Sequence, residues 1–206
     1  MTQKTNTLAV FDFDGTITKC DSLIPFLWTV AGTPRFLLNL GLLVLWVITF
    51  KLGFLTRQEA KEKVLALFLK GMERKKLEEL GSSYAQNRLA QLIRKKALLA
   101  LHDHLQAGDR VMIISASPDF YIRSWAQTVG NIEVHSTRLE FDSVGHFTGH
   151  ILGKNCYGPE KVARLTAVVP DLDRYTLVVY GDSKGDHDLY KIAQQAHHRY
   201  FENDSR

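Results

Sequence analysis

The stretch Leu8-Ala9-Val10-Phe11-Asp12-Phe13-Asp14-Gly15-Thr16 determines how the rest of the chain is interpreted. Four apolar residues lead directly into two carboxylates that are two positions apart, and a Gly-Thr turn follows. An apolar run of this length, bounded by glycine, predicts a buried strand of a parallel sheet. Alternate residues of an extended chain point the same way, so we expect Asp12 and Asp14 to leave the strand end on one side.

Two such carboxylates need an explanation. Held side by side they repel each other, and burial makes their charges costly. A divalent cation such as Mg²⁺ relieves this cost, because it prefers hard oxygen ligands. The alternative for this segment alone is a strand that ends in a polar turn, with Asp14 and Gly15 as the turn residues. The remainder of the sequence decides between the two interpretations.

The composition limits the class of protein. A chain of 206 residues with 45% hydrophobic residues can form one domain, or one domain with a smaller insertion. A net charge of +4 suits an anionic substrate or a membrane surface. The two cysteines, Cys20 and Cys156, lie far apart, which predicts free thiols in a reducing compartment. Residues 1–7 contain no cleavable signal sequence, so we expect a cytoplasmic protein.

Residues 20–105 have helical periodicity and no strand signal. Asp21 and Ser22 form an N-cap pair, and Thr56 with Glu59 forms a capping box. The helix that follows Thr56 is expected to place Lys61 on its polar face. Basic clusters in this block lack interleaved aromatic residues, so we expect no nucleic-acid partner.

Segment 36–50 is the most apolar part of this helical block. Only two of its fifteen residues, Asn39 and Thr49, are polar. The segment is shorter than the ~18–20 apolar residues of a membrane span. We therefore expect either a buried helix or a helix that lies in the membrane interface. Arg35 and Lys51 at its borders fit both alternatives.

Strand patterns return after residue 108. Apolar runs at 110–115 and 175–180 each end in polar residues, at Ser115 and at Gly181-Asp182-Ser183-Lys184-Gly185-Asp186. Between them we expect a helix over 120–129, a short strand over 132–135, a hairpin formed by 139–141 and 147–151, and a helix that begins at Pro159. Helices that alternate with buried strands predict a doubly wound, Rossmann-like α/β sheet.

In such a sheet, ligands bind at the carboxyl ends of the strands. Asp12 and Asp14, Ser115, and Asp182 with Asp186 would therefore meet at one edge. Lys161 lies near a helix start before the last strand and can reach the same edge, whereas its rival Lys154 lies in a loop. Carboxylates, a hydroxyl and an ammonium together are expected around a cation and an anion.

These motifs resemble those of the haloacid-dehalogenase-like superfamily, in the order Asp12-Phe-Asp14-Gly15-Thr16, Ser115, Lys161 and Gly181-Asp182-Ser183-x-x-Asp186. The helical insertion after the first motif resembles the cap of subfamily IB, the phosphoserine-phosphatase-like branch. The resemblance implies a catalytic core at 1–19 and 106–206 and a helical cap at 20–105.

The resemblance also implies a role for each site residue. Asp12 would be the nucleophile, forming an aspartyl-phosphate, and Asp14 the general acid and then the base. Mg²⁺ would be held by Asp12, the Asp14 carbonyl and Asp182, with Asp186 in support. The phosphoryl oxygens would contact Ser115, Lys161 and the backbone around Gly15 and Thr16. Asp21 would contribute to specificity by contacting a substrate amine.

Three functions remain in competition. The first is a Mg²⁺-dependent phosphatase of a small phosphate ester such as phosphoserine. The second keeps this chemistry but takes a lipid phosphate, since segment 36–50 is similar in kind to the apolar cap segment of bacterial phosphatidylglycerophosphatases; this function implies peripheral contact with the membrane. The third is an inactive module that binds a membrane surface or a partner. The intact acidic motifs count against the third.

Overall fold

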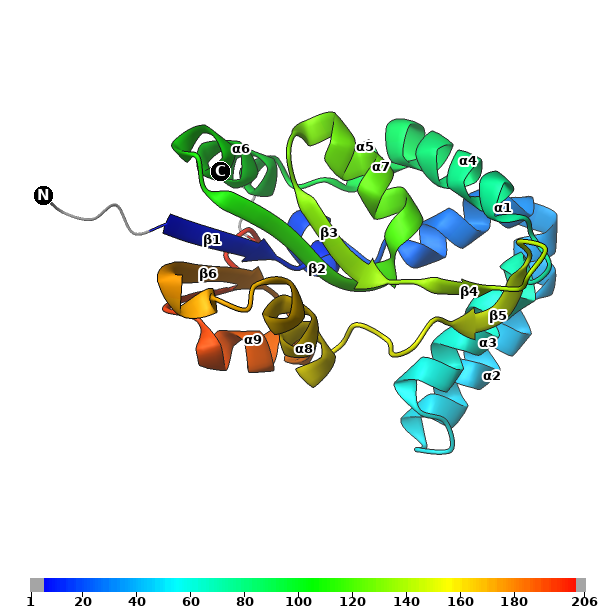
Figure 1. Cartoon of the computed structure of the whole chain (residues 1–206). Helices are drawn as coiled ribbons and strands as arrows, with labels where there is room; N and C mark the ends of the chain where they lie inside the picture. Colours follow the sequence, from blue (N-terminus) through cyan, green and yellow to red (C-terminus); the bar gives the residue numbers. More distant parts are fainter. Residues whose placement is uncertain (1–5, 203–206) are drawn as a thin grey trace, which may run out of the picture.

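The computed structural model describes residues 6–202 and contains a central sheet of five parallel strands in the order β3-β2-β1-β6-β7 (Figure 1). The strands are β1 (Asn6–Phe11), β2 (Arg110–Pro118), β3 (Glu133–Thr137), β6 (Tyr175–Gly181) and β7 (Gln195–His198). Val10 in the central strand pairs with Met112 on one side and with Val179 on the other. The predicted doubly wound α/β fold is confirmed, and β7 is a strand that the sequence analysis did not predict.

Alternate residues of the buried strands face two different apolar layers. Leu8 and Val10 pack in the layer of α8 (Pro159–Val168) and α9 (His187–Ile192). Ala9 and Phe11 pack in the layer of α6 (Lys95–Ala107) and α7 (Asp119–Val129). Helices thus cover both faces of the sheet, so ligand-binding polar groups are expected at the edge formed by the carboxyl ends of the strands.

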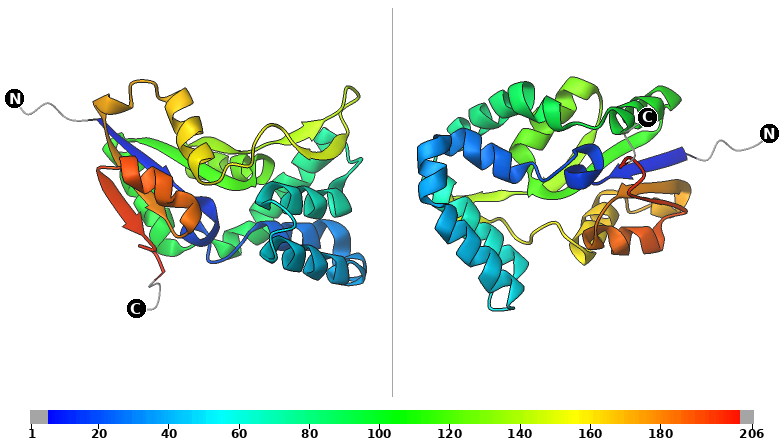
Figure 2. Two further views of the ribbon diagram at one scale, coloured as in Figure 1. Left: turned by 90° about the horizontal axis from the view of Figure 1, so that it is seen from below. Right: turned by 180° about the vertical axis from the view of Figure 1, so that it is seen from behind.

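Beyond the carboxyl ends of the strands lies a group of helices: α1 (Leu23–Leu38), α2 (Leu40–Lys51), α3 (Arg57–Leu69) and α4 (Arg74–Tyr84) (Figures 1 and 2). A π-helical segment at Ala85–Leu89 and the short α5 (Ala90–Leu92) lead back to α6. The hairpin of β4 (Leu139–Phe141) and β5 (Phe147–Ile151) extends from β3 and packs against α3. The division into a core and a cap at 20–105 stays a prediction, and its terminal residues 1–5 and 203–206 lie outside the described chain.

The apolar segment 36–50 is divided between α1 and α2, which meet at Asn39. Leu43 is the only residue of α2 that is buried, so α2 is not an enclosed helix. Large apolar side chains that stand exposed over α1, α2 and the turn after them are Ile24, Trp28, Leu37, Leu38, Leu40, Leu42, Val44, Leu45, Val47, Ile48, Leu52 and Phe54. Between residues 6 and 202 no single helix is long and apolar enough to cross a membrane; α1 and α2 together reach that length, but they are bent by 93°.

Candidate active site

Asp12 begins a tight turn at the end of β1. Its backbone N–H donates to the Tyr180 carbonyl over 2.8 Å, which continues the pairing with β6, and its Oδ1 accepts from the Phe13 N–H over 2.7 Å. Gly15 then has a φ of +79°, where a side chain is strained. A Cβ there would lie 2.3 Å from Asp182 Oδ2, so the turn needs glycine both for its conformation and for the approach of Asp182.

Lys161 binds two carboxylates in the interior of this edge. Its Nζ lies 2.8 Å from Asp12 Oδ1 and 2.6 Å from Asp186 Oδ1, and all three side chains are buried. Burial raises the pKa of Asp12 to about 7, against the opposing effect of the Lys161 charge. Lys154 lies elsewhere, in a loop, and its backbone carbonyl accepts a hydrogen bond from the Arg164 guanidinium. The structure therefore brings Lys161, and not Lys154, to the other predicted site residues.

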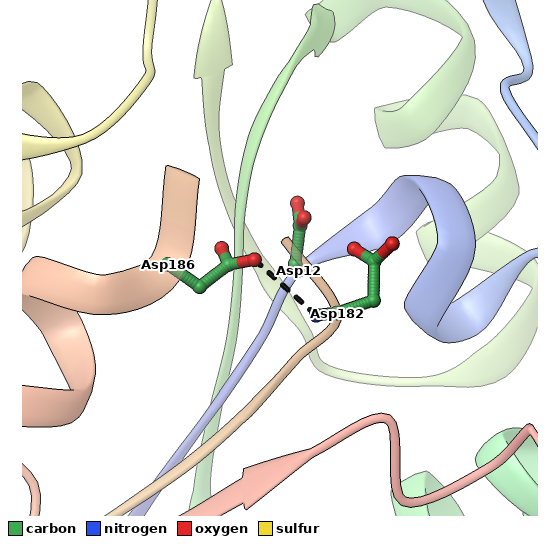
Figure 3. A group of neighbouring side chains, drawn as sticks. All are labelled: Asp12, Asp182 and Asp186. Atoms are coloured by element: carbon green, nitrogen blue, oxygen red, sulfur yellow. Dashed lines mark hydrogen bonds between the residues drawn. The ribbon is translucent and has the colours of Figure 1, made fainter. Parts of the chain in front are cut away.

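Asp182 and Asp186 extend the acidic cluster beside Asp12 (Figure 3). Asp186 Oδ2 accepts from the backbone N–H groups of Asp182 and Ser183 at 3.3 and 3.1 Å, so both of its oxygens are engaged. Asp182 Oδ1 is buried and has no hydrogen-bond partner among the described residues. Asp12, Asp182 and Asp186 each offer an oxygen within 4.8 Å of the others. An unpartnered buried carboxylate oxygen in a cluster of hard ligands fits a Mg²⁺ ion.

Asp14 faces a different set of partners. Its Oδ1 accepts from the Ser22 N–H over 2.8 Å, and its Oδ2 accepts from the Ser117 hydroxyl. Burial, and then the nearby charge of Asp21, raise the pKa of Asp14 to about 6, while the two hydrogen bonds oppose the shift. A carboxyl with such a pKa can hold a proton near neutral pH and release it.

Three of the remaining predicted residues lie around one cavity of about 450 Å³. Ser115, Gly15 and Asp21 line this cavity together with Asp12, Asp14, Lys161 and Asp182. Thr16 does not line it: its side chain is buried in the turn, with no hydrogen-bond partner for Oγ1 within residues 6–202. Asp21 Oδ1 accepts from the Ile24 N–H over 3.0 Å, so it also caps α1.

Among the residues that line the same cavity and that sequence reasoning missed are Arg57, Lys61 and Ser117. Lys61 was expected on the polar face of its helix, but its ammonium is partly buried between α3 and the end of β2. Helical periodicity places a residue on a face of its own helix, yet it does not say which element packs against that face. Ser117 lies two residues after Ser115, and this spacing was the one available signal for it.

Fold and site together define the class of the protein: a Rossmann-like α/β protein in which carboxylates, a hydroxyl and an ammonium group meet at the strand ends. The profile of the haloacid dehalogenase-like hydrolases matches residues 9–191, and the chain belongs to this family.

The chain is also similar to other proteins over most of its length. Protein CicA of Caulobacter vibrioides is 34% identical over 197 residues, covering 94% of this chain and 86% of CicA. A crystal structure of a Bordetella pertussis protein of unknown function has a TM-score of 0.78 at 23% identity, covering 94% of this chain and 89% of that one. A substrate-bound phosphoserine phosphatase has a TM-score of 0.65 at 18% identity, covering 98% and 91%. At these identities the two structures support the fold.

Proposed function

We propose that the protein is a Mg²⁺-dependent phosphomonoester hydrolase that acts through an aspartyl-phosphate on Asp12. The observation that carries the proposal is the way Asp12 is held. Lys161 and the Phe13 N–H both contact Oδ1, which leaves Oδ2 without a hydrogen bond from the described residues. A carboxylate oriented through one oxygen can use the other as a nucleophile.

The proposed reaction has two steps. Oδ2 of Asp12 forms a bond to phosphorus while the ester P–O bond breaks, and Asp14 gives its proton to the leaving alcohol. Water then attacks the same phosphorus, Asp14 takes a proton from that water, and the bond from phosphorus to Asp12 breaks to release phosphate. Asp14 is suited to both tasks because its pKa is raised to about 6.

Mg²⁺ would be held by Asp12, the Asp14 carbonyl and Asp182, with Asp186 orienting the loop through its bonds to backbone N–H groups. When bound, the ion supplies positive charge that offsets the repulsion between Asp12 and an anionic phosphate. Ser115 and Lys161 would hold the phosphoryl oxygens, with the turn around Gly15 and Thr16.

A small phosphate ester such as phosphoserine is the first substrate class. The cavity supports it because it is of limited volume and charged groups of both signs line it, among them Asp21, Arg57 and Arg94. An ester that carries an amine and a carboxylate could place its amine against Asp21 and its carboxylate against one of these arginines. One of the solved structures that are similar in fold is a phosphoserine phosphatase with its substrate bound.

The test is phosphate release with and without Mg²⁺ over a panel of soluble phosphomonoesters, with Asp12→Asn as the blank. Turnover that needs Mg²⁺ and disappears in Asp12→Asn is expected. Trapping of ³²P on wild-type protein but not on Asp12→Asn would identify the intermediate. Turnover that persists in Asp12→Asn would contradict the nucleophile, and a complete lack of turnover and trapping would favour an inactive binding module.

A lipid phosphate is the second candidate substrate, and the exposed apolar surface of α1 and α2 favours it. Residues 22–58 contain no acidic side chain, while Arg35, Lys51 and Arg57 are basic, a pattern that suits an anionic bilayer. Arg57 also connects this surface to the site: its guanidinium lies 5.2 Å from the Phe50 ring centroid and 4.1 Å from that of Tyr157, and it lines the cavity.

Vesicles distinguish the two substrates. The same assay is run with phosphatidylglycerophosphate in anionic vesicles and with its short-chain, water-soluble analogue. Faster turnover in vesicles than of the analogue or of phosphoserine would favour the lipid phosphate. Equal or slower turnover in vesicles would favour the small ester and leave the apolar surface without a part in catalysis.

A further inference from the structure

The Lys61 ammonium ties α3 to the sheet at the edge of the site. Its Nζ donates to the Ala116 carbonyl over 2.9 Å and to Asn155 Oδ1 over 2.9 Å. Asn155 Oδ1 also accepts from the Thr137 hydroxyl over 3.1 Å, so its position is fixed by β3. Both acceptors of the ammonium are neutral.

Neutral partners leave the Lys61 charge uncompensated. Within residues 6–202, Lys61 makes no ion pair, whereas Lys161 contacts two carboxylates. Even a partly buried ammonium is costly when no anion contacts it. Burial accordingly lowers the pKa of Lys61 to about 8, although the more distant charges of Asp14 and Asp21 oppose the shift.

The place of Lys61 indicates which anion would compensate it. Its acceptor Ala116 stands between Ser115 and Ser117 at the end of β2, and Lys61 lines the same cavity as Ser115 and Asp12. Ser115 Oγ accepts from the Ser117 N–H over 3.1 Å, which leaves the Ser115 O–H to donate to a phosphoryl oxygen. An ammonium has three N–H donors, and two of those of Lys61 are engaged.

We propose that Lys61 donates its third N–H to an oxygen of the phosphoryl group, as a second cationic phosphate ligand that comes from α3 rather than from the sheet. The inference rests on the proposed function, because it assumes that phosphate binds at Ser115. Phosphate binding would then add a contact to the existing tie between α3 and the end of β2. The substrate class would be phosphate in its dianionic form, since two ammonium groups would share it.

Inorganic phosphate is the probe, and its Kd is measured by calorimetry in the presence of Mg²⁺. Lys61→Met is expected to raise the Kd at least about tenfold, the usual loss for a charged hydrogen bond. Lys63→Met is the matched control, because Lys63 is exposed on the same helix, and its Kd should equal that of the wild type. Ser115→Ala is the reference for the phosphate site itself.

A second measurement separates binding from a merely structural tie. With a pKa of about 8, Lys61 loses its charge as the pH rises from 7 to 9, so wild-type phosphate binding should weaken over this range. Lys61→Arg keeps its charge and should show a smaller loss. The charged or titratable groups that act on Lys61 are Asp14, Asp21, Arg57 and Cys156, and all four are unchanged in both proteins.

The outcomes are distinct. Weaker phosphate binding in Lys61→Met and Ser115→Ala, but not in Lys63→Met, supports the inference. Weaker binding in Ser115→Ala alone overturns it while the proposed function stands. Phosphate binding that no variant affects contradicts the proposed site itself. If Lys61→Met folds poorly, equal pH dependence in the wild type and Lys61→Arg overturns the inference.

Discussion

The ammonium of Lys161 lies 2.8 Å from Oδ1 of Asp12, and both side chains are at most 9% exposed. The same ammonium contacts Asp186 at 2.6 Å, so one buried cation serves two carboxylates that would otherwise repel each other. Lys161 thereby joins α8 to the strand that carries the nucleophile candidate. Lys161 fixes the orientation of Asp12 and stabilises this edge of the sheet. Its removal should therefore affect both activity and stability.

Lys161→Met is expected to lower the free energy of unfolding by about 3–5 kcal/mol, because it leaves buried carboxylates without their cation. Activity should be lost as well. The control is Lys191→Met: its pair with Asp188 at 2.7 Å is a surface pair, with the lysine side chain 73% exposed, and its removal should change stability by about 1 kcal/mol or less. Urea denaturation measures both, and equal stability of the two variants would contradict a structural part for Lys161.

Gly15→Ala should abolish activity for a reason beyond strain. A Cβ at Gly15 would lie 2.3 Å from Asp182 Oδ2, so it must displace a candidate metal ligand. Gly71→Ala is the matched control, because Gly71 has nearly the same φ, +80°, and nothing lies within 4 Å of its Cβ position. Each variant should lose about 1–2 kcal/mol from the left-handed conformation. Only Gly15→Ala should lose Mg²⁺-dependent turnover, and equal turnover in the two variants would show that the approach of Asp182 is unimportant.

Mg²⁺ itself should stabilise the folded protein through Asp182. At a concentration about 100 times its Kd, a ligand that binds only the native state adds about 2.7 kcal/mol. We expect Mg²⁺ to raise the Tm of the wild type and of Asp188→Asn, a nearby acidic residue paired with Lys191. Asp182→Asn should show little or no rise. A Tm that Mg²⁺ raises equally in Asp182→Asn would place the ion elsewhere.

Asp14→Asn should slow the release of phosphate from an alkyl ester by about 10²- to 10⁴-fold, the usual contribution of a general acid. The amide can still accept from the Ser22 N–H, which holds Asp14 Oδ1 over 2.8 Å in the wild type. An ester with a good leaving group, such as p-nitrophenyl phosphate, needs less protonation and should lose less. Equal losses on both esters would indicate that Asp14 organises the site rather than transferring a proton.

Most of the site residues that could be predicted are fixed by strand ends, and Lys161 was placed by its position near a helix start. Asp12, Ser115 and Asp182 each follow an apolar run, and parallel strands bring such positions to one edge whatever the packing elsewhere. Lys61 could not be placed, because its burial depends on contacts with Ala116 and Asn155, far away in the sequence. Strand β7 was missed because Gln195–His198 is a short, polar edge strand with no apolar alternation.

The exposure of α2, like the burial of Lys61, could not be predicted from a sequence pattern. A helix that is apolar on every side has no face from which burial can be read. The structure adds that the apolar run breaks at Asn39 and that α2 turns away from the line of α1 by 93°. The side chains of α2 consequently form part of the molecular surface, and their effect on membrane binding can be tested without disturbing a core.

Wild-type protein is expected to cosediment with anionic vesicles. Leu45→Glu combined with Ile48→Glu should weaken this binding at least about tenfold, because the native leucine and isoleucine would enter the membrane interface. Leu45 and Ile48 are 50% and 47% exposed, so the double variant should fold normally. Leu99→Glu is the control, since Leu99 is 61% exposed on α6. If vesicles leave the wild type in the supernatant, the apolar surface of α2 is not a membrane-binding element, and the lipid-phosphate candidate loses its main support.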